Sequence, residues 1–124
     1  MGGIGKAVEK ARKVAGFSLK IEVECRNLAE AREACRSGAD VTMLDNFSPA
    51  ALKEAAPVIK SEFPHVIVEA SGGISLKTIK SYCVDGVDVI SLSSTTQGHP
   101  AVDFSFKILK EGHNPLNPQV QSPN

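Results

Sequence analysis

The stretch VEASGGISLKTIKSYC, residues 68–83, joins a β-branched apolar run to an amphipathic segment through one serine and two glycines. Ser75 is a residue type that favours helix starts, and apolar residues recur at helical spacing after it. A plain turn needs one glycine, whereas two let backbone N–H groups crowd around an anion. The stretch predicts a strand, a loop and a helix, and leaves two interpretations of the loop open: a phosphate-binding loop or a tight turn.

Three more apolar runs are each followed by a segment with helical signals, so that strands are predicted at residues 19–25, 40–45, 65–71 and 88–94. Asn27 with Glu30 resembles a capping box, and Ser48 before Pro49 is a typical helix start. Pro57 lies inside the second of these helices and predicts a kink or a restart there.

Helical periodicity also predicts which side chains face inward. In the upstream helix, GKAVEKARKVAG at residues 5–16, these are Ala7, Val8, Ala11 and Ala15. In the helix after Ser75 they are Leu76, Ile79, Tyr82 and Cys83, and a last helix that ends near Gly112 carries Phe104, Ile108 and Leu109.

Strands that alternate with helices indicate an α/β fold with a parallel sheet. A faint internal repeat supports this reading, since SGADVTMLDN at residues 37–46 resembles DGVDVISLSS at residues 85–94. Two architectures are compatible with it: an open doubly wound sheet, or a β/α barrel built from repeated βα units. One domain is predicted over residues 1–112, with a proline-rich disordered tail at residues 113–124.

The composition excludes several classes of protein. The chain has 124 residues, of which 42% are hydrophobic and 23% charged, with 14 basic and 14 acidic side chains. This balance gives no strong field that favours nucleic acid or an anionic membrane. Cys25, Cys35 and Cys83 show no metal-binding spacing and are predicted to be reduced, packed thiols of an intracellular, cytoplasmic protein.

Polar or glycine residues stand at the end of every predicted strand: Glu24, then Asp45, then Ser71, Gly72 and Gly73, then Ser93. In parallel β/α folds ligands bind at this edge of the sheet. Glu24 and Asp45 end neighbouring strands, which lie about 4.8 Å apart, so Mg²⁺ or a ribose diol is expected between their carboxylates. The alternatives are that Asp45 is a helix cap and that Glu24 faces solvent.

Five segments carry a more specific signal. KIEVEC, GADVTMLDNFSP, VEASGGI, DVISLSSTTQ and DFSFK, at these spacings, resemble the carboxyl-terminal half of the quinolinate phosphoribosyltransferases, also called carboxylating nicotinate-nucleotide pyrophosphorylases. The resemblance covers residues 2–112, nearly the whole chain.

The resemblance implies an activity and an assembly. The family makes nicotinate mononucleotide from quinolinate and phosphoribosyl diphosphate with Mg²⁺, and releases diphosphate and CO₂ in de novo NAD biosynthesis. Its members join an amino-terminal α/β domain to an incomplete β/α barrel, so the resemblance implies that this chain's repeated βα units form about half of an incomplete TIM-like β/α barrel. They form homodimers or hexamers in which a neighbouring subunit completes each site.

By position, Glu24 and Asp45 match the acidic residues that hold the ribose hydroxyls and Mg²⁺, and Ser71, Gly72 and Gly73 match the loop that binds the 5′-phosphate. Ser93 stands where the family usually has glycine, and Thr95 where it has leucine.

The cationic cluster that grips the quinolinate carboxylates in the family would lie upstream of Met1. Three hypotheses follow: a carboxyl-terminal portion with little activity alone, a non-catalytic subunit that binds and modulates full-length enzyme, or an unrelated phosphate-binding barrel protein.

Overall fold

A computed structural model describes residues 3–93 and 98. Helices and strands alternate along this part of the chain, as the sequence predicts. Their bounds are α1 (Ile4–Ala15), β1 (Glu22–Cys25), α2 (Leu28–Arg36), β2 (Val41–Asp45), α3 (Pro49–Glu62), β3 (Ile67–Ser71), α4 (Ile79–Tyr82) and β4 (Val89–Ile90). Each strand is shorter than its apolar run in the sequence, most of all β4.

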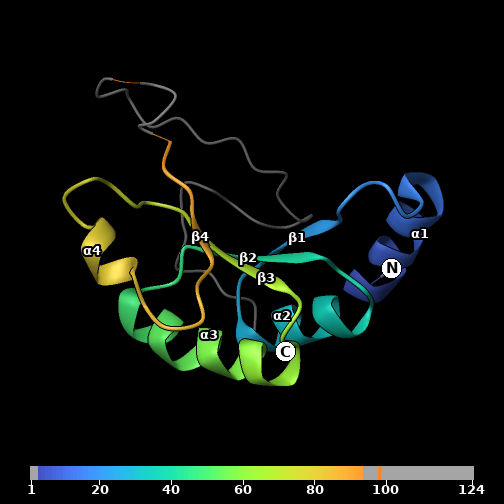
Figure 1. The fold of residues 1–124 in the computed structure, drawn as a ribbon, viewed down its shortest axis with the longest axis horizontal. Helices are drawn as coiled ribbons and strands as arrows, with labels where there is room; N and C mark the ends of the chain where they lie inside the picture. The colour runs from blue at the N-terminus through green and yellow to red at the C-terminus, as the bar shows by residue number, and fades with distance from the viewer. Residues whose placement is uncertain (1–2, 94–97, 99–124) are drawn as a thin grey trace, which may run out of the picture.

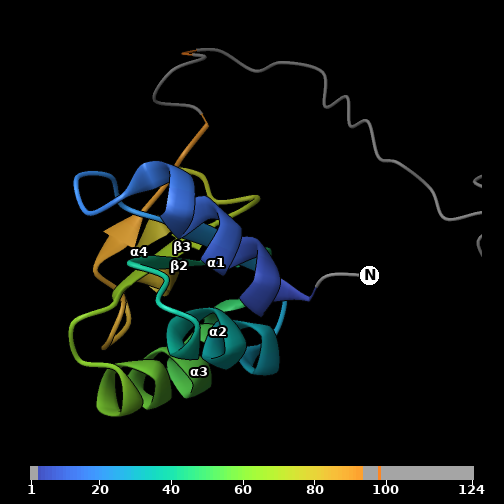
Figure 2. The same ribbon diagram turned by 90° about the vertical axis from the view of Figure 1, so that its right-hand side faces the viewer.

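The strands form one parallel sheet in the order β1-β2-β3-β4. A doubly wound sheet reverses its strand order at one point and carries helices on both faces. Here the order does not reverse, and α2 and α3 lie on the same side of the sheet (Figures 1 and 2). The predicted α/β fold is confirmed, and of the two architectures left open the partial β/α barrel is the one observed.

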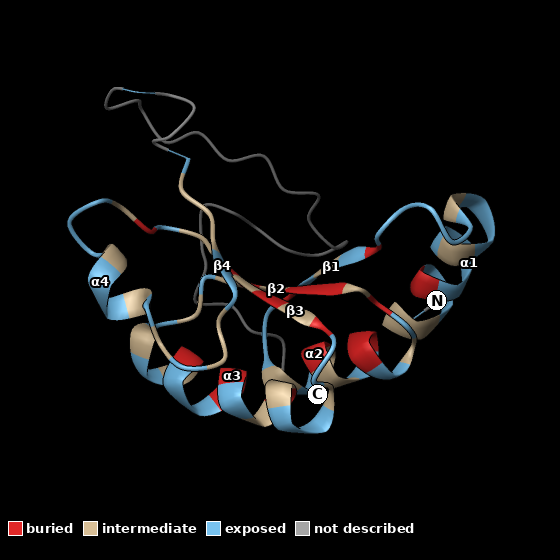
Figure 3. Ribbon diagram, viewed as in Figure 1, coloured by how far each residue is buried: buried red, intermediate tan, exposed pale blue. Residues whose placement is uncertain are grey.

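The hydrophobic core lies between the sheet and these two helices (Figure 3). Side chains alternate along a strand, so one face of the sheet supplies the core. Its members on the strands are at most 1% exposed: Cys25, Thr42, Leu44, Val68 and Ala70. The other face, called the open face below, carries by the same alternation and register Glu22, Glu24, Val41, Met43, Asp45, Ile67, Glu69 and Ser71.

The helix starts predicted at Asn27 and Ser48 are confirmed. The side chain of Asn27 accepts a hydrogen bond from the Glu30 N–H at 2.9 Å, and the Glu30 carboxylate accepts one from the Arg26 N–H at 2.9 Å. The Ser48 hydroxyl accepts the Ala51 N–H at 3.2 Å. Pro57 was predicted to kink α3 or to restart it, and the restart is wrong, because α3 runs unbroken through that residue, with Leu52 and Ile59 buried on either side of it.

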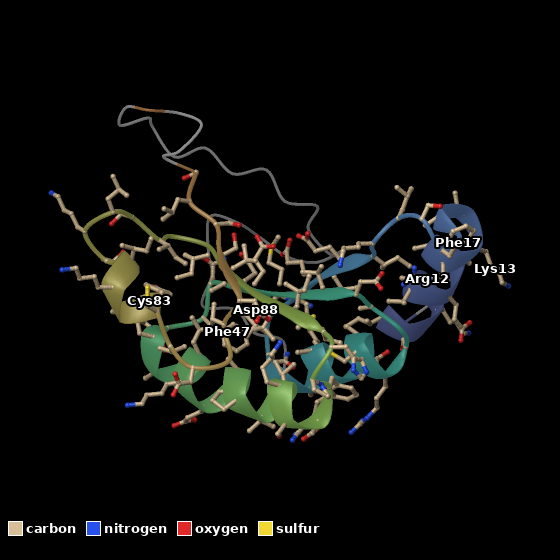
Figure 4. The ribbon with its side chains drawn as sticks, viewed as in Figure 1. Arg12, Lys13, Phe17, Phe47, Cys83 and Asp88 are labelled. Atoms are coloured by element: carbon tan, nitrogen blue, oxygen red, sulfur yellow. The ribbon has the colours of Figure 1, made fainter. Side chains whose placement is uncertain are left out.

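At the amino ends of the strands, one aspartate and one arginine tie three segments together. Asp40 Oδ2 accepts the Ile21 N–H at 2.7 Å and Arg12 Nη2 at 2.6 Å. Arg12 also donates to the carbonyl oxygens of Gly16, Leu19 and Gly38 (Figure 4). The Ile21 N–H and the Arg12 guanidinium hold the pKa of Asp40 below its ordinary value. This group is called the arginine clamp below.

The same device recurs one pair of strands later. Asp88 Oδ2 accepts the Val68 N–H at 2.8 Å and Lys60 Nζ at 3.0 Å, and Lys60 also donates to the Val66 carbonyl at 3.0 Å. Burial raises the pKa of Asp88, but the Val68 and Lys60 interactions outweigh it and hold the pKa below its ordinary value. This group is called the lysine clamp below. Asp40 and Asp88 occupy matching positions of the internal repeat, so the repeat corresponds to two similar hydrogen-bonded clamps.

The predicted inward faces of two helices are only partly confirmed. In α1, Val8 is buried as predicted, but Ala7 and Ala11 are exposed. The helix predicted to start at Ser75 begins at Ile79 and has four residues, while Leu76 is 74% exposed. The predicted packing of all three cysteines is wrong for one of them, since Cys25 and Cys35 are buried but Cys83 is exposed (Figure 4).

Three predictions lie outside the described residues: the end of the last strand at Ser94, the helix with Phe104, Ile108 and Leu109, and the tail at residues 113–124. Within the described residues, no helix is long and apolar enough to cross a membrane.

Candidate functional site

A hollow of about 330 Å³ opens at the carboxyl ends of β3 and β4. Four residues that the sequence marks as candidates line it together, although two strands supply them. The lining residues are Ser71, Gly72, Gly73, Ile74, Ser91, Leu92 and Ser93. The structure therefore brings the predicted phosphate loop and the Ser93 position to one place.

The two glycines of this loop differ in their surroundings. Gly72 has φ +94°, and a Cβ there would lie 2.8 Å from the Asn46 backbone nitrogen and closer still to its side chain. Asn46, itself at φ 56°, donates its N–H to the Ser71 carbonyl at 2.9 Å. Gly72 is thus needed where the β2 and β3 loops meet. Gly73 has φ +64° with open space around its Cβ position, which leaves room for a ligand to approach its backbone.

The helix predicted to start at Ser75, directly after this loop, does not start there. A hydrogen-bonded turn stands in its place: Ser75 accepts the Ile79 N–H at 2.8 Å, and the Thr78 hydroxyl accepts the Ser75 N–H at 3.0 Å. α4 begins only after this turn. Any anion in the hollow would therefore be held by loop N–H groups and serine hydroxyls rather than by a helix end.

Glu24 and Asp45 lie on the open face of neighbouring strands, but not opposite each other, and Glu24 is exposed, which is the alternative that the sequence left open for it. Glu24 pairs with Met43, so Asp45 stands two residues further along β2. One strand spacing combined with two residues of rise puts the two backbones about 8 Å apart, rather than the 4.8 Å expected. Asp45 pairs instead with Ser71, which places its carboxylate beside the glycine loop.

The alternative role of Asp45 as a helix cap is not observed, because Ser48 caps α3. The Asp45 carboxylate instead accepts a hydrogen bond from the Asn46 amide at 2.7 Å. Asn46 therefore fixes both the loop crossing at Gly72 and the direction of the Asp45 side chain.

Sequence reasoning missed Glu69, which the register places beside Met43 on the open face. Its carboxylate accepts a hydrogen bond from the Ser91 hydroxyl, and Ser91 lines the hollow. Burial, followed by the charge of Glu69, raises the pKa of Glu22 on the same face. The sequence could have indicated this position. Glu69 and Ser71 are two residues apart on one strand, so their side chains lie on the same face of the sheet.

The open face suits Mg²⁺ only together with a ligand. Among the described residues no group of three or more His, Cys, Asp or Glu side chains could hold a metal ion. Mg²⁺ is usually bound by one or two carboxylates with substrate phosphates and water completing its shell. Glu24 and Asp45 fit that pattern, and they do not form a complete protein cage.

A parallel partial barrel with a glycine loop and carboxylates at the carboxyl ends of its strands belongs to the β/α-barrel class, in which ligands bind at that edge. The family comparison is more specific. Residues 1–107 match the family model of the quinolinate phosphoribosyl transferase C-terminal domain. The chain therefore belongs to this family, as the motifs in its sequence indicate.

Individual relatives agree with this assignment. The chain is 51% identical over 115 residues to nicotinate-nucleotide pyrophosphorylase [carboxylating] of Rattus norvegicus, and 49% identical to the Homo sapiens protein of the same name. The nicotinate-nucleotide pyrophosphorylase structure from Francisella tularensis superposes with a TM-score of 0.69 at 37% identity, over 81% of this chain and 35% of that one.

The chain is shorter than these relatives. It covers 38% of the rat protein and 39% of the human one, while 93% of the chain itself is matched in each case. Most of a relative's length therefore has no counterpart in the sequence described here.

Proposed function

We propose that the chain supplies the ribose-phosphate half of a site that transfers a phosphoribosyl group from phosphoribosyl diphosphate to quinolinate. The products would be nicotinate mononucleotide, diphosphate and CO₂. The observation that carries the proposal is the meeting of Ser71, Gly72, Gly73 and Ser93 in one hollow beside Asp45. The family assignment selects this chemistry from the many that use a phosphate loop.

The chain's residues would act by positioning. The Ser71 hydroxyl and the Gly73 N–H would hold the 5′-phosphate, and Glu24 with Asp45 would hold the ribose hydroxyls. Displacement at the anomeric carbon passes through a positively charged, oxocarbenium-like state, which carboxylates on the open face would stabilise. Mg²⁺, held by Glu24 and Asp45, would neutralise the diphosphate leaving group.

Ser93 and Glu69 would tune the same site. Ser93 adds a hydroxyl to the wall of the phosphate hollow, where the family usually has no side chain. Glu69 and Ser91 would form the floor between the phosphate loop and the open-face carboxylates.

Two parts of the proposal concern the assembly. We expect a homodimer or hexamer in the longer family members, with quinolinate held by a cationic cluster outside the ribose-phosphate half. The second function considered, a non-catalytic subunit that binds full-length enzyme, stays a prediction from the sequence. The cytoplasmic location stays a prediction from the sequence.

Calorimetric titration of the 124-residue chain with phosphoribosyl diphosphate and Mg²⁺ tests the proposed site. Asp45→Asn removes one charge and keeps the shape of the side chain, so we expect binding to weaken about tenfold or more. Asp85→Asn, at an exposed aspartate away from the hollow, is the matched control and should bind as the unchanged chain does. Equal affinity for both variants would contradict the role of Asp45.

A further inference from the structure

The hollow at the carboxyl ends of β3 and β4 has walls of different hydrogen-bonding character. On the β3 side, the backbone N–H groups of Gly72 and Gly73 donate no hydrogen bond within the described part of the chain. Both residues have positive φ, and successive free N–H groups in such a turn form a concave surface that suits an anion. This wall therefore offers donors to a ligand.

The β4 side differs, because Ser91 has already used both of its donors. Its N–H donates to the Ala70 carbonyl at 3.0 Å, and its hydroxyl donates to the Glu69 carboxylate. A serine has one N–H and one hydroxyl proton, so no donor of Ser91 remains for a ligand. The lone pairs of the hydroxyl oxygen remain, and they can only accept a hydrogen bond.

Glu69 acts on the hollow from outside it. It is not among the lining residues, and its partner on β4 is Val89, two residues before Ser91. Side chains two residues apart on a strand lie on one face, so the Glu69 carboxylate and the Ser91 hydroxyl meet on the open face. A carboxylate only accepts hydrogen bonds, and it therefore fixes the direction of the Ser91 O–H.

We propose that Glu69 is a positioning residue that orients the ligand, with phosphate oxygens on the glycine loop and a donor hydroxyl on Ser91. The ligand class that fits is a sugar phosphate, because its phosphate accepts hydrogen bonds and its hydroxyls donate them. An anion that only accepts, such as sulfate, satisfies the glycine loop and leaves Ser91 without a partner. The inference rests on the proposed ribose-phosphate site, and adds the pair of residues that sets the direction of the ligand there.

NMR titrations of the ¹⁵N-labelled 124-residue chain with sulfate and with ribose 5-phosphate, at constant ionic strength, test the inference. The Gly73 amide reports both affinities, and we expect the unchanged chain to prefer ribose 5-phosphate by about tenfold. Glu69→Gln keeps the size of the side chain but can donate to the Ser91 oxygen, which leaves the Ser91 O–H free to donate to an anion. Sulfate affinity should then rise about threefold relative to that of ribose 5-phosphate, so that the preference falls to about threefold.

Ser91→Ala shows whether the effect passes through the serine hydroxyl. Alone, it should weaken ribose 5-phosphate about threefold and leave sulfate unchanged. In the Ser91→Ala background, Glu69→Gln should not alter the preference further. Glu22→Gln removes an equal charge from the same face, where the Glu22 side chain makes no hydrogen bond within residues 3–93 and 98, and should keep the original preference.

Three results would overturn the inference. If Glu69→Gln weakens both probes equally, Glu69 is structural only. If Glu69→Gln still changes the preference in the Ser91→Ala background, its charge acts without the serine. If Glu69→Gln fails to fold, Ser91→Ala decides, and an unchanged preference in that variant overturns the inference. Failure of the proposed function is a separate result: a chain that binds ribose 5-phosphate but not phosphoribosyl diphosphate with Mg²⁺ would contradict that function alone.

Discussion

The two ends of the parallel sheet use charged residues in different ways. At the amino ends, Asp40 and Asp88 are each held by a backbone N–H and a cation. At the carboxyl ends, none of the four ion pairs in residues 3–93 and 98 includes Glu24, Asp45 or Glu69. Paired charges fix a fold, while open-face carboxylates next to a glycine loop can respond to a ligand. The amino ends therefore carry stability, and the carboxyl ends carry the candidate site.

Gly72 lies at the carboxyl ends but is needed for stability. Its substitution should cause the largest loss of stability among the variants considered. Gly72→Ala combines a disfavoured φ with a clash against the Asn46 backbone, so we expect a loss of about 3 kcal/mol in the free energy of unfolding. Gly73→Ala shares the positive φ but meets open space, and should cost about 1 kcal/mol. Urea denaturation measures both. Similar losses for the two variants would show that the Asn46 contact contributes little.

Substitutions in the arginine and lysine clamps at the amino ends should cause the next largest losses of stability. Arg12→Ala removes a guanidinium that binds three carbonyls and Asp40, and should cost about 2 kcal/mol, because partial exposure weakens each contact. Lys60→Ala removes two contacts and should cost about 1 kcal/mol.

Lys13→Ala, at an exposed neighbour of Arg12, is the control and should change stability by less than about 0.5 kcal/mol. Phosphoribosyl diphosphate should bind the folded fraction of both clamp variants as it binds the unchanged chain. Weaker binding by a fully folded clamp variant would show that the two ends are coupled.

Lowering the pH should reduce stability through the aspartates at the amino ends of the strands. This is the smallest of the expected effects. The folded-state pKa values of Asp40 and Asp88 lie below the ordinary value of 3.8. Their contribution to stability is therefore fully present above that value, and is lost as pH falls through the lower folded-state values. Unfolding free energy measured between pH 5 and pH 2 should fall less steeply in Asp40→Asn than in Asp85→Asn. Parallel curves would mean that the Arg12 pair does not contribute to acid unfolding.

Local signals in the sequence predict much of this fold. The caps at Asn27 and Ser48, the order of strands and helices, and the meeting of Ser71 with Ser93 are all as expected. The repeat that contains Asp40 and Asp88 was visible, but its function as a pair of clamps needed the positions of Arg12 and Lys60 in space.

The errors in prediction have physical causes. Periodicity marks the apolar face of α1, but it cannot show that none of the described strands covers Ala7 and Ala11. The Ser75–Thr78 turn competes with the helix expected there, as serine and threonine side chains often do. The register that separates Glu24 from Asp45 is set by the pairing of whole strands, and the difference between Gly72 and Gly73 depends on Asn46 in another loop.

The most direct test of the division between the two ends is an NMR titration of the ¹⁵N-labelled 124-residue chain with phosphoribosyl diphosphate and Mg²⁺. We expect saturable shifts for the amides of Ser71, Gly73 and Asp45, with those of Gly38 and Asp88 at the amino ends unchanged. Saturable shifts at the amino ends, or none at the glycine loop of a folded sample, would contradict the assignment of ligand binding to the carboxyl ends of the strands.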